Sequence, residues 1–228
     1  ALTNGLSVAG KSLADATVVV AGLGPGGQAA VRLLVAAEVG QVIACDSRGA
    51  VSPGREGLDE PGLAWIAEHT NPEGRTGQAP ELVRGADAFI GLSTPNLLSA
   101  DDVAAMAPDP VVLALAMPEP EIAPDAAAKV ARVYATGRPD VPNQINSGLA
   151  SPGIWRGALD CRATEINQAM TLAAATAIAE TAVEDLPLSE VNVVPSIFNQ
   201  KLVPNVAAAV RRAAEATGVA RLTGAAAG

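Results

Sequence analysis

The sequence is poor in aromatic residues and in charge for its length. Aromatic residues make up 2% of the 228 residues and charged residues 17%, whereas 49% are hydrophobic. A disordered chain needs the opposite balance of low hydrophobicity and high charge, so this composition excludes one. The chain is also long enough to bury a sizeable core.

Cysteine and histidine are almost missing. Cys45 and Cys161 are the two cysteines and form no C-x-x-C pair, which predicts small buried side chains in a reducing compartment, not disulfide or metal chemistry. His69 is the single histidine, and we predict that it ends a helix in solvent and is not a general base.

Long apolar runs and basic leader segments are also absent. No uninterrupted apolar run approaches the roughly 18 residues that a membrane-spanning helix needs, and no basic segment leads into an apolar one. We therefore predict a cytoplasmic protein with no membrane partner. The net charge of −9 argues against nucleic acid, because phosphates would be repelled. An anionic cofactor would have to be held by local groups.

A strand followed by a glycine-rich turn lies near the amino terminus. Thr17–Val20 is a β-branched run typical of a strand that is buried on both faces. Gly22, Gly24 and Gly27 then follow the G-x-G-x-x-G spacing of dinucleotide-binding loops. The next segment, 28–37, reads as a helix whose amino end would face the phosphates.

A second predicted strand, 41–45, supports this interpretation because it ends at an acid. Asp46 lies about twenty residues beyond the loop, where a carboxylate accepts hydrogen bonds from a ribose. This favours NAD, although Arg48 beside it keeps NADP as an alternative, since an arginine can hold a 2′-phosphate. The cofactor-binding residues that we predict here are Gly22, Gly24, Pro25, Gly26, Gly27, Asp46, Ser47 and Arg48.

Strands and helices continue to alternate up to about residue 136. The predicted strands 86–92, 110–116 and 132–135 end in small or polar residues, among them Ser93 and Thr94, which we add to the cofactor site. Helices are predicted over 99–106, with Ser99 as the N-cap, and over 124–130. The fold class is therefore α/β, a Rossmann-like doubly wound parallel sheet flanked by helices in three layers.

The remaining segments complete a single predicted domain, 1–228. We expect a leading helix within 1–14, short helices over 63–69 and 80–84, a long functional loop over 143–160 and an irregular stretch over 186–200. The C-terminal region 164–228 is predicted to be helical, with one helix over 164–183 capped by Thr164 and another from Pro204 to Gly218. Because Ala1 stands inside a helical pattern, we expect the chain to be part of a longer protein.

Three longer strings resemble the signature stretches of the malic enzymes. They are ALAMPEPEI at 114–122, ATGRPDVPNQIN at 135–146 and PGIWRGALDCRA at 152–163. This family oxidises malate with NAD or NADP and then decarboxylates oxaloacetate to pyruvate with a divalent metal, Mg or Mn. The resemblance covers the family's C-terminal, cofactor-binding domain. It implies that the catalytic Tyr and Lys and the metal ligands precede Ala1, that this chain alone is inactive, and that the full-length protein is a homo-oligomer.

Two positions depart from the family pattern. Met117 stands where the family has Asn in its A-N-P string, and Ser147 stands where a second Asn follows Asn146. The resemblance places Met117 and Asn146 at the cofactor, and both of them with Ser147 at the carboxylates of the substrate. Because Met donates no hydrogen bond, we expect malate affinity to fall if both positions are used in the family's way. The expected substrate is malate or a related 2-hydroxy acid. A malic-enzyme-like oxidoreductase with another substrate and a non-catalytic dinucleotide-binding module remain the alternatives.

Overall fold

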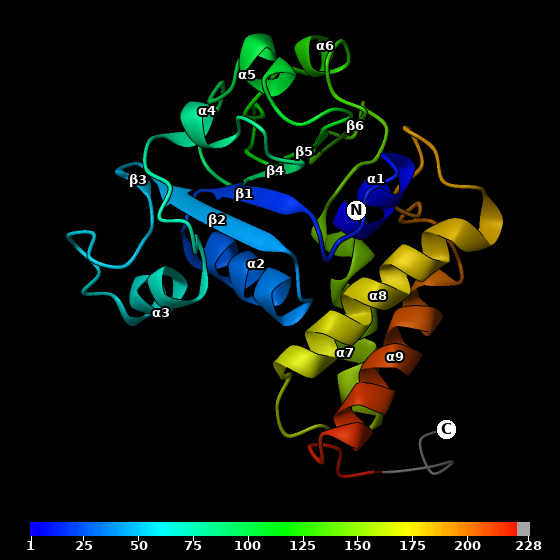
Figure 1. Cartoon of the computed structure of the whole chain (residues 1–228). Coiled ribbons are helices and arrows are strands. Elements are labelled where there is room, and N and C mark those ends of the chain that lie inside the picture. Colours follow the sequence, from blue (N-terminus) through cyan, green and yellow to red (C-terminus); the bar gives the residue numbers. More distant parts are fainter. Residues whose placement is uncertain (223–228) are drawn as a thin grey trace. The chain divides into compact units, whose positions relative to one another are not determined.

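The computed structural model describes residues 1–222 of the chain (Figure 1). The chain folds into two compact units, Ala1–Gln144 and Ile145–Gly228. The expectation of one domain over the whole chain stays a prediction.

A six-stranded sheet in the order β3-β2-β1-β4-β5-β6 forms the centre of the first unit. Strands β2, β1, β4, β5 and β6 are parallel, which confirms the doubly wound sheet, while β3 runs antiparallel to β2. Sequence reasoning missed β3, because two residues are too short to show a pattern. The strands are β1 (Thr17–Ala21), β2 (Gln41–Asp46), β3 (Gly49–Ala50), β4 (Ala88–Gly91), β5 (Val111–Ala114) and β6 (Val133–Thr136).

Helices cover both faces of this sheet, as the three-layer prediction requires. In Figure 1, α4, α5 and α6 lie on one face, and α2 lies across β1 and β2 on the other. The short α1 contacts β5. The helices of this unit are α1 (Leu2–Val8), α2 (Pro25–Ala36), α3 (Pro61–His69), α4 (Ala79–Leu82), α5 (Ala100–Ala104) and α6 (Pro124–Ala127).

The first core lies between the sheet and α4–α6. Val19, Ile43 and Phe89 are opposite one another on neighbouring strands, and all three are fully buried. Val18 and Val20, which point to the other face, are equally buried. Strand β1 is therefore apolar on both faces, as its β-branched run predicts.

Local sequence explains where two helices of the first unit begin. Helix α2 begins at Pro25 and not at Gln28, because proline fits the first helical position and Gly24 serves as the N-cap. Ser99 caps α5 as predicted, and its hydroxyl accepts a hydrogen bond from the backbone N–H of Asp102.

Up to residue 222, the second unit contains a short 3-10 turn, Ser147–Leu149, and three helices, α7 (Ser151–Asp160), α8 (Gln168–Asp185) and α9 (Leu202–Ala216). The prediction of a loop over 143–160 is wrong for its second half, which is helix α7. Glycine lowers helix propensity, but here Gly153 and Gly157 let α7 approach α9 closely. A Cβ at Gly153 would lie 2.6 Å from Cγ1 of Val206, so packing decides this helix.

The start of α8 is also later than predicted. Thr164 is not its cap, because the helix begins at Gln168 and the hydroxyl of Thr164 donates to the carbonyl of Val219 instead. Asn167 caps the helix instead, through a 3.1 Å hydrogen bond from the N–H of Met170. Helix α9 has Pro204 in its first turn and is followed by Gly218, as predicted, and 186–200 is irregular.

The two cysteines are buried and His69 ends a helix in solvent, as predicted. Cys45 and Cys161 are free and buried. His69 is exposed at the end of α3, where its ring stacks on Trp65 at 4.1 Å. No helix within residues 1–222 combines the length and the apolar character needed to cross a bilayer.

Candidate functional site: the carboxyl edge of the parallel sheet

The turn after β1 is built so that only glycine fits at two of its positions. Gly22 has a φ of 95°, and a Cβ there would overlap the carbonyl oxygen of Leu92 at the end of β4. Its N–H donates to the carbonyl of Cys45 on β2 at 2.9 Å. A Cβ at Gly27 would overlap the carbonyl oxygen of Gly22. The turn is therefore wedged between two strand ends.

The other two glycines of the turn face open space. A Cβ at Gly24 or Gly26 would meet no atom within 4 Å. Gly24 is the N-cap of α2, and the N–H groups of Gly26 and Gly27 in the first turn have no acceptor within the helix. This open, positively polarised surface fits the pyrophosphate of a dinucleotide.

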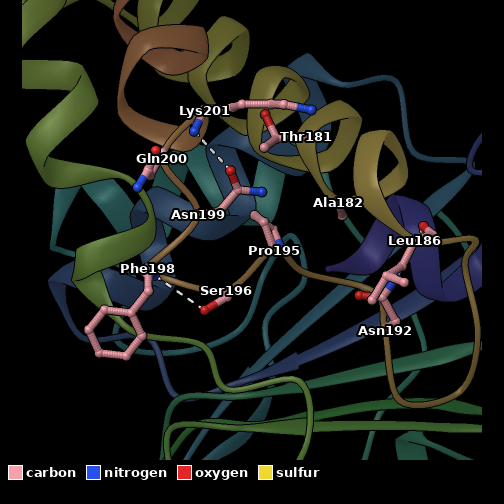
Figure 2. Close-up of a pocket in the computed structure, with 10 residues that line it drawn as sticks. All are labelled: Thr181, Ala182, Leu186, Asn192, Pro195, Ser196, Phe198, Asn199, Gln200 and Lys201. Carbon is pink, nitrogen blue, oxygen red and sulfur yellow. Dashed lines mark hydrogen bonds between the residues drawn. The ribbon is translucent and has the colours of Figure 1, made fainter.

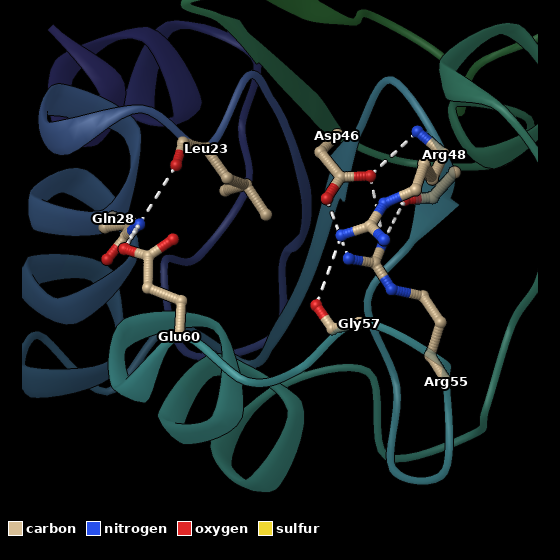
Figure 3. A network of polar contacts seen from close by, with 8 residues as sticks. Leu23, Gln28, Asp46, Arg48, Arg55, Gly57 and Glu60 are labelled. Carbon is tan, nitrogen blue, oxygen red and sulfur yellow. Dashed lines mark hydrogen bonds and ion pairs between the residues drawn. The ribbon is translucent and has the colours of Figure 1, made fainter.

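The predicted ribose carboxylate already has protein partners. Asp46 ends β2, and both of its oxygens accept hydrogen bonds from the guanidinium of Arg55, at 2.8 and 2.7 Å (Figure 3). The backbone N–H of Arg48 adds a third hydrogen bond at 2.8 Å. Burial raises the pKa of Asp46, but the Arg55 hydrogen bond, the Arg48 N–H and the two positive charges outweigh it and hold the pKa below its usual value.

The two arginines also tie the following loop to the sheet. Arg55 Nη1 donates to the carbonyl of Gly49 at 3.1 Å, and Arg48 Nη2 donates to the carbonyl of Gly57 at 3.1 Å. The side chains of Arg55 and Asp46 are only 13% and 19% exposed, whereas Ser47 and Arg48 are exposed. Arg55 was not among the predicted site residues.

A second group of polar contacts holds the glycine turn to α3. The side-chain amide of Gln28 donates to the carbonyl of Leu23 at 3.1 Å and to the carboxylate of Glu60 at 2.8 Å. Figure 3 shows this group apart from the Asp46 pair. Glu60 is therefore directed toward α2.

A buried carboxylate connects the ends of β4 and β5. Glu121 is 0% exposed, and its two oxygens accept the backbone N–H of Ser93 at 2.9 Å and of Ala116 at 3.0 Å. A Cβ at Gly91 would overlap this carboxylate. Glu121 thus fixes the backbone just after β4 and just after β5, where each strand passes into a loop. It was not among the predicted site residues.

The other predicted cofactor residues of the first unit lie at the same edge of the sheet. Ser93 and Thr94 follow β4 and are exposed. Met117 follows β5, and its side chain is 61% exposed. The structure therefore brings the glycine turn, Asp46, Ser93, Thr94 and Met117 to the carboxyl ends of adjacent parallel strands, where open α/β sheets bind ligands.

Asn146 and Ser147 belong to the second unit. Asn146 caps the 3-10 turn, and its side-chain oxygen accepts the N–H of Gly148 at 2.7 Å. Ser147 is exposed. That these two residues meet the sheet edge stays a prediction.

Two pockets lie away from the predicted site residues. One, of about 490 Å³, is in the second unit and is lined by the end of α8 and the segment before α9 (Figure 2). Phe198 at its rim is 85% exposed. The other, of about 500 Å³, includes Gln41 and Val42 at the start of β2, which is the opposite end of that strand from Asp46. Within residues 1–222, no cluster of three or more His, Cys, Asp or Glu side chains is suited to a metal ion.

Neither missed residue carried a strong sequence signal. Arg55 is one charged residue in a Gly- and Pro-rich loop. The only sequence signal for its contact with Asp46 was that it follows Asp46 by nine residues. Glu121 is one of two acids in a proline-rich turn, and Glu119, two residues before it, is exposed. The two glutamates differ in how deeply they are buried, and burial cannot be read from a single sequence.

Comparisons with known proteins show the family to which the chain belongs. The family described as malic enzyme, NAD binding domain, matches residues 1–215. The NAD-dependent malic enzyme of Geobacillus stearothermophilus is 48% identical over 220 residues, which are 96% of this chain and 46% of that protein. The NADP-dependent malic enzyme of Salmonella typhimurium is 40% identical over 96% of this chain and 31% of that protein.

A solved structure gives the same result. The crystal structure of Entamoeba histolytica malic enzyme matches with a TM-score of 0.92 and 35% identity, over 97% of this chain and 47% of that one. The chain thus spans half or less of the length of these relatives. It belongs to the NAD-binding domain family of the malic enzymes.

Proposed function

We propose that this chain is the dinucleotide-binding part of an NAD(P)-dependent oxidoreductase that converts malate to pyruvate and CO₂. The observation that supports this proposal most directly is the open surface over Gly24 and Gly26 at the amino end of α2. Packing against neighbouring backbone atoms leaves no room for a side chain at Gly22 or Gly27, whereas Gly24 and Gly26 have room for one. The absence of side chains there is therefore explained by a ligand that approaches the backbone.

Different residues at this edge would contact different parts of the cofactor. The backbone N–H groups of Gly24, Gly26 and Gly27 would bind the pyrophosphate, and Pro25 would hold the helix start. Asp46, Ser47 and Arg48 would lie at the adenine ribose, and Ser93, Thr94 and Met117 toward the nicotinamide. When bound, the nicotinamide accepts a hydride from the 2-hydroxy acid. Asn146 and Ser147 would orient that acid through its carboxylates.

The rest of the chemistry would come from a part of the protein outside this chain. We infer that it supplies the acid and base groups and the ligands of Mg²⁺ or Mn²⁺, which would provide Lewis-acid polarisation of a carbonyl group. The full-length protein would then be a cytoplasmic homo-oligomer, and the isolated chain would bind cofactor without turning over malate. Turnover of malate with Mg²⁺ by the isolated chain would contradict this division.

A pair of glycine variants tests the cofactor site. Gly26→Ala adds a methyl group to open space in a helix, so we expect the fold to be as stable or slightly more stable, while NADH affinity falls at least about tenfold. Gly10→Ala is the matched control: it also faces open space, but its φ of 68° makes alanine cost about 1–2 kcal/mol.

The two variants therefore separate binding from stability. NADH fluorescence titration and thermal melts of both are the measurements. If Gly26→Ala binds NADH like the parent chain, the pyrophosphate does not lie over the amino end of α2.

Met117 favours a second candidate, a related oxidoreductase with another 2-hydroxy acid as substrate. Its thioether is exposed at the site edge and donates no hydrogen bond. In the full-length protein, Met117→Asn combined with Ser147→Asn lowers KM for malate if malate is the substrate. An unchanged KM would favour the second candidate.

A further inference from the structure

The carboxylate at the ribose position is neutralised by a neighbouring guanidinium. In a dinucleotide site an acid at this position accepts hydrogen bonds from the ribose and repels a 2′-phosphate. Here Arg55 binds both oxygens of Asp46 in a bidentate pair, and this pair is largely buried. The repulsion that would exclude a 2′-phosphate is therefore cancelled by a group that is part of the fold.

Two arginines stand close to the single carboxylate of Asp46. Arg48, two residues beyond Asp46, is exposed and has its guanidinium fixed by the carbonyl of Gly57. The three side chains together carry one net positive charge. Glu60, an acid of the same loop, is turned toward Gln28 instead of the pair. In a chain of net charge −9, these three side chains thus place one positive charge beside a predicted phosphate site.

We propose that Arg55 determines the cofactor selectivity of this chain: by neutralising Asp46 it allows an adenosine ribose with or without a 2′-phosphate to bind, so that both NAD and NADP are accepted. This rests on the proposed function. Arg48 is the group that meets the phosphate, and Arg55 acts through Asp46 as a positioning residue.

Two adenosine probes test this without any turnover. 5′-AMP and 2′,5′-ADP differ only in the 2′-phosphate, and their Kd values for the whole chain are measured by calorimetry. We expect the parent chain to bind both within about tenfold of each other. In Arg55→Gln the Kd of 2′,5′-ADP rises roughly 10- to 100-fold, while that of 5′-AMP changes less than about threefold.

The matched control is Arg75→Gln. Arg75 also donates to backbone carbonyls of the first unit, those of Leu82 and Arg84, but it does not touch Asp46. It should leave the ratio of the two Kd values unchanged. An equal change of the ratio in both variants would overturn the proposal.

The double variant Arg55→Gln with Asp46→Asn separates neutralisation from direct contact. If Arg55 acts by cancelling the charge of Asp46, removing that charge restores 2′,5′-ADP binding to within about threefold of the parent chain. No restoration means that Arg55 does not act through Asp46, which overturns the proposal. If neither probe binds the parent chain, the proposed function fails first, and the two failures are thus distinguishable.

Discussion

The contact between Gly91 and Glu121 makes a quantitative prediction about the sheet edge. Gly91 is the last residue of β4, and the ideal position of its Cβ lies 2.6 Å from Oε2 of Glu121. The carboxylate is not free to move away, because it is 0% exposed and accepts two backbone hydrogen bonds, from Ser93 and Ala116. An alanine at 91 must therefore displace a fixed and buried group.

The free energies of unfolding follow from these contacts. Gly91→Ala overpacks the site and should destabilise the chain by about 1–3 kcal/mol. Glu121→Ala leaves the N–H of Ala116 buried without an acceptor, at about 1–3 kcal/mol, and also removes the acceptor of the partly buried N–H of Ser93. In the double variant the new methyl group occupies space that the carboxylate has left. Its cost should therefore be about 1–2 kcal/mol less than the sum of the single variants.

Urea unfolding followed by circular dichroism measures all three variants. Glu119→Gln is the control, since that carboxylate is 63% exposed, 3.6 Å from Arg138, and should shift stability by less than about 0.5 kcal/mol. If Gly91→Ala costs as much in the Glu121→Ala background as in the parent chain, the carboxylate does not fill the space above Gly91 and the predicted overpacking does not occur.

Three further predictions concern other parts of the chain, and a fourth concerns a buried thiol. Gly157→Ala should destabilise the second unit by about 1–3 kcal/mol in urea, because its Cβ would lie 2.5 Å from the carbonyl oxygen of Ala207; an unchanged midpoint would contradict that packing. Asn167→Ala removes the cap of α8 and should cost about 1 kcal/mol, whereas Asn167→Ser should recover most of it. The pKa of Asp46 is lowered in the folded chain, so its stabilising effect is present above the unfolded pKa of about 3.9 and is lost as the pH falls through the folded value; Asp46→Asn should flatten that acid limb of the stability curve. Burial and the charge of Asp46 raise the pKa of Cys45 to about 12, so iodoacetamide at about pH 8 should not modify it until the chain unfolds, as mass spectrometry would show.

The parts of the site that sequence reasoning found are those with local causes. The β-branched run of β1, the glycine spacing and the acid at the end of β2 each arise within a few residues, and the structure has all three where they were expected. The four parallel strand pairs follow from the alternation of strands and helices. Fold class was therefore predictable from the chain alone.

The parts that were missed depend on contacts between distant residues. Glu121 meets Ser93 across 28 positions, and nothing near Glu121 distinguishes it from Glu119. Arg55 reaches Asp46 because β3 folds the intervening loop back, and β3 is only two residues long. Helix α7 forms in a glycine-containing segment because α9 packs against it. Local propensity disfavours α7 and gives no signal for the contacts of Glu121 and Arg55. Tertiary packing decides all three.

Arg55 and Glu121 together resolve a conflict in the composition of the chain. A protein of net charge −9 has to bind an anionic dinucleotide, and two carboxylates, Asp46 and Glu121, stand at the very edge where the cofactor is proposed to lie. Each is occupied from within the fold, Asp46 by a guanidinium and a backbone N–H, and Glu121 by two backbone N–H groups. The charge of Asp46 is neutralised by a cation, Glu121 is held in place by two backbone N–H groups, and both carboxylates order the loops around the site. The acidity of the whole chain is thus compatible with a cofactor site, because the potential at this edge depends on these few pairs more than on the net charge.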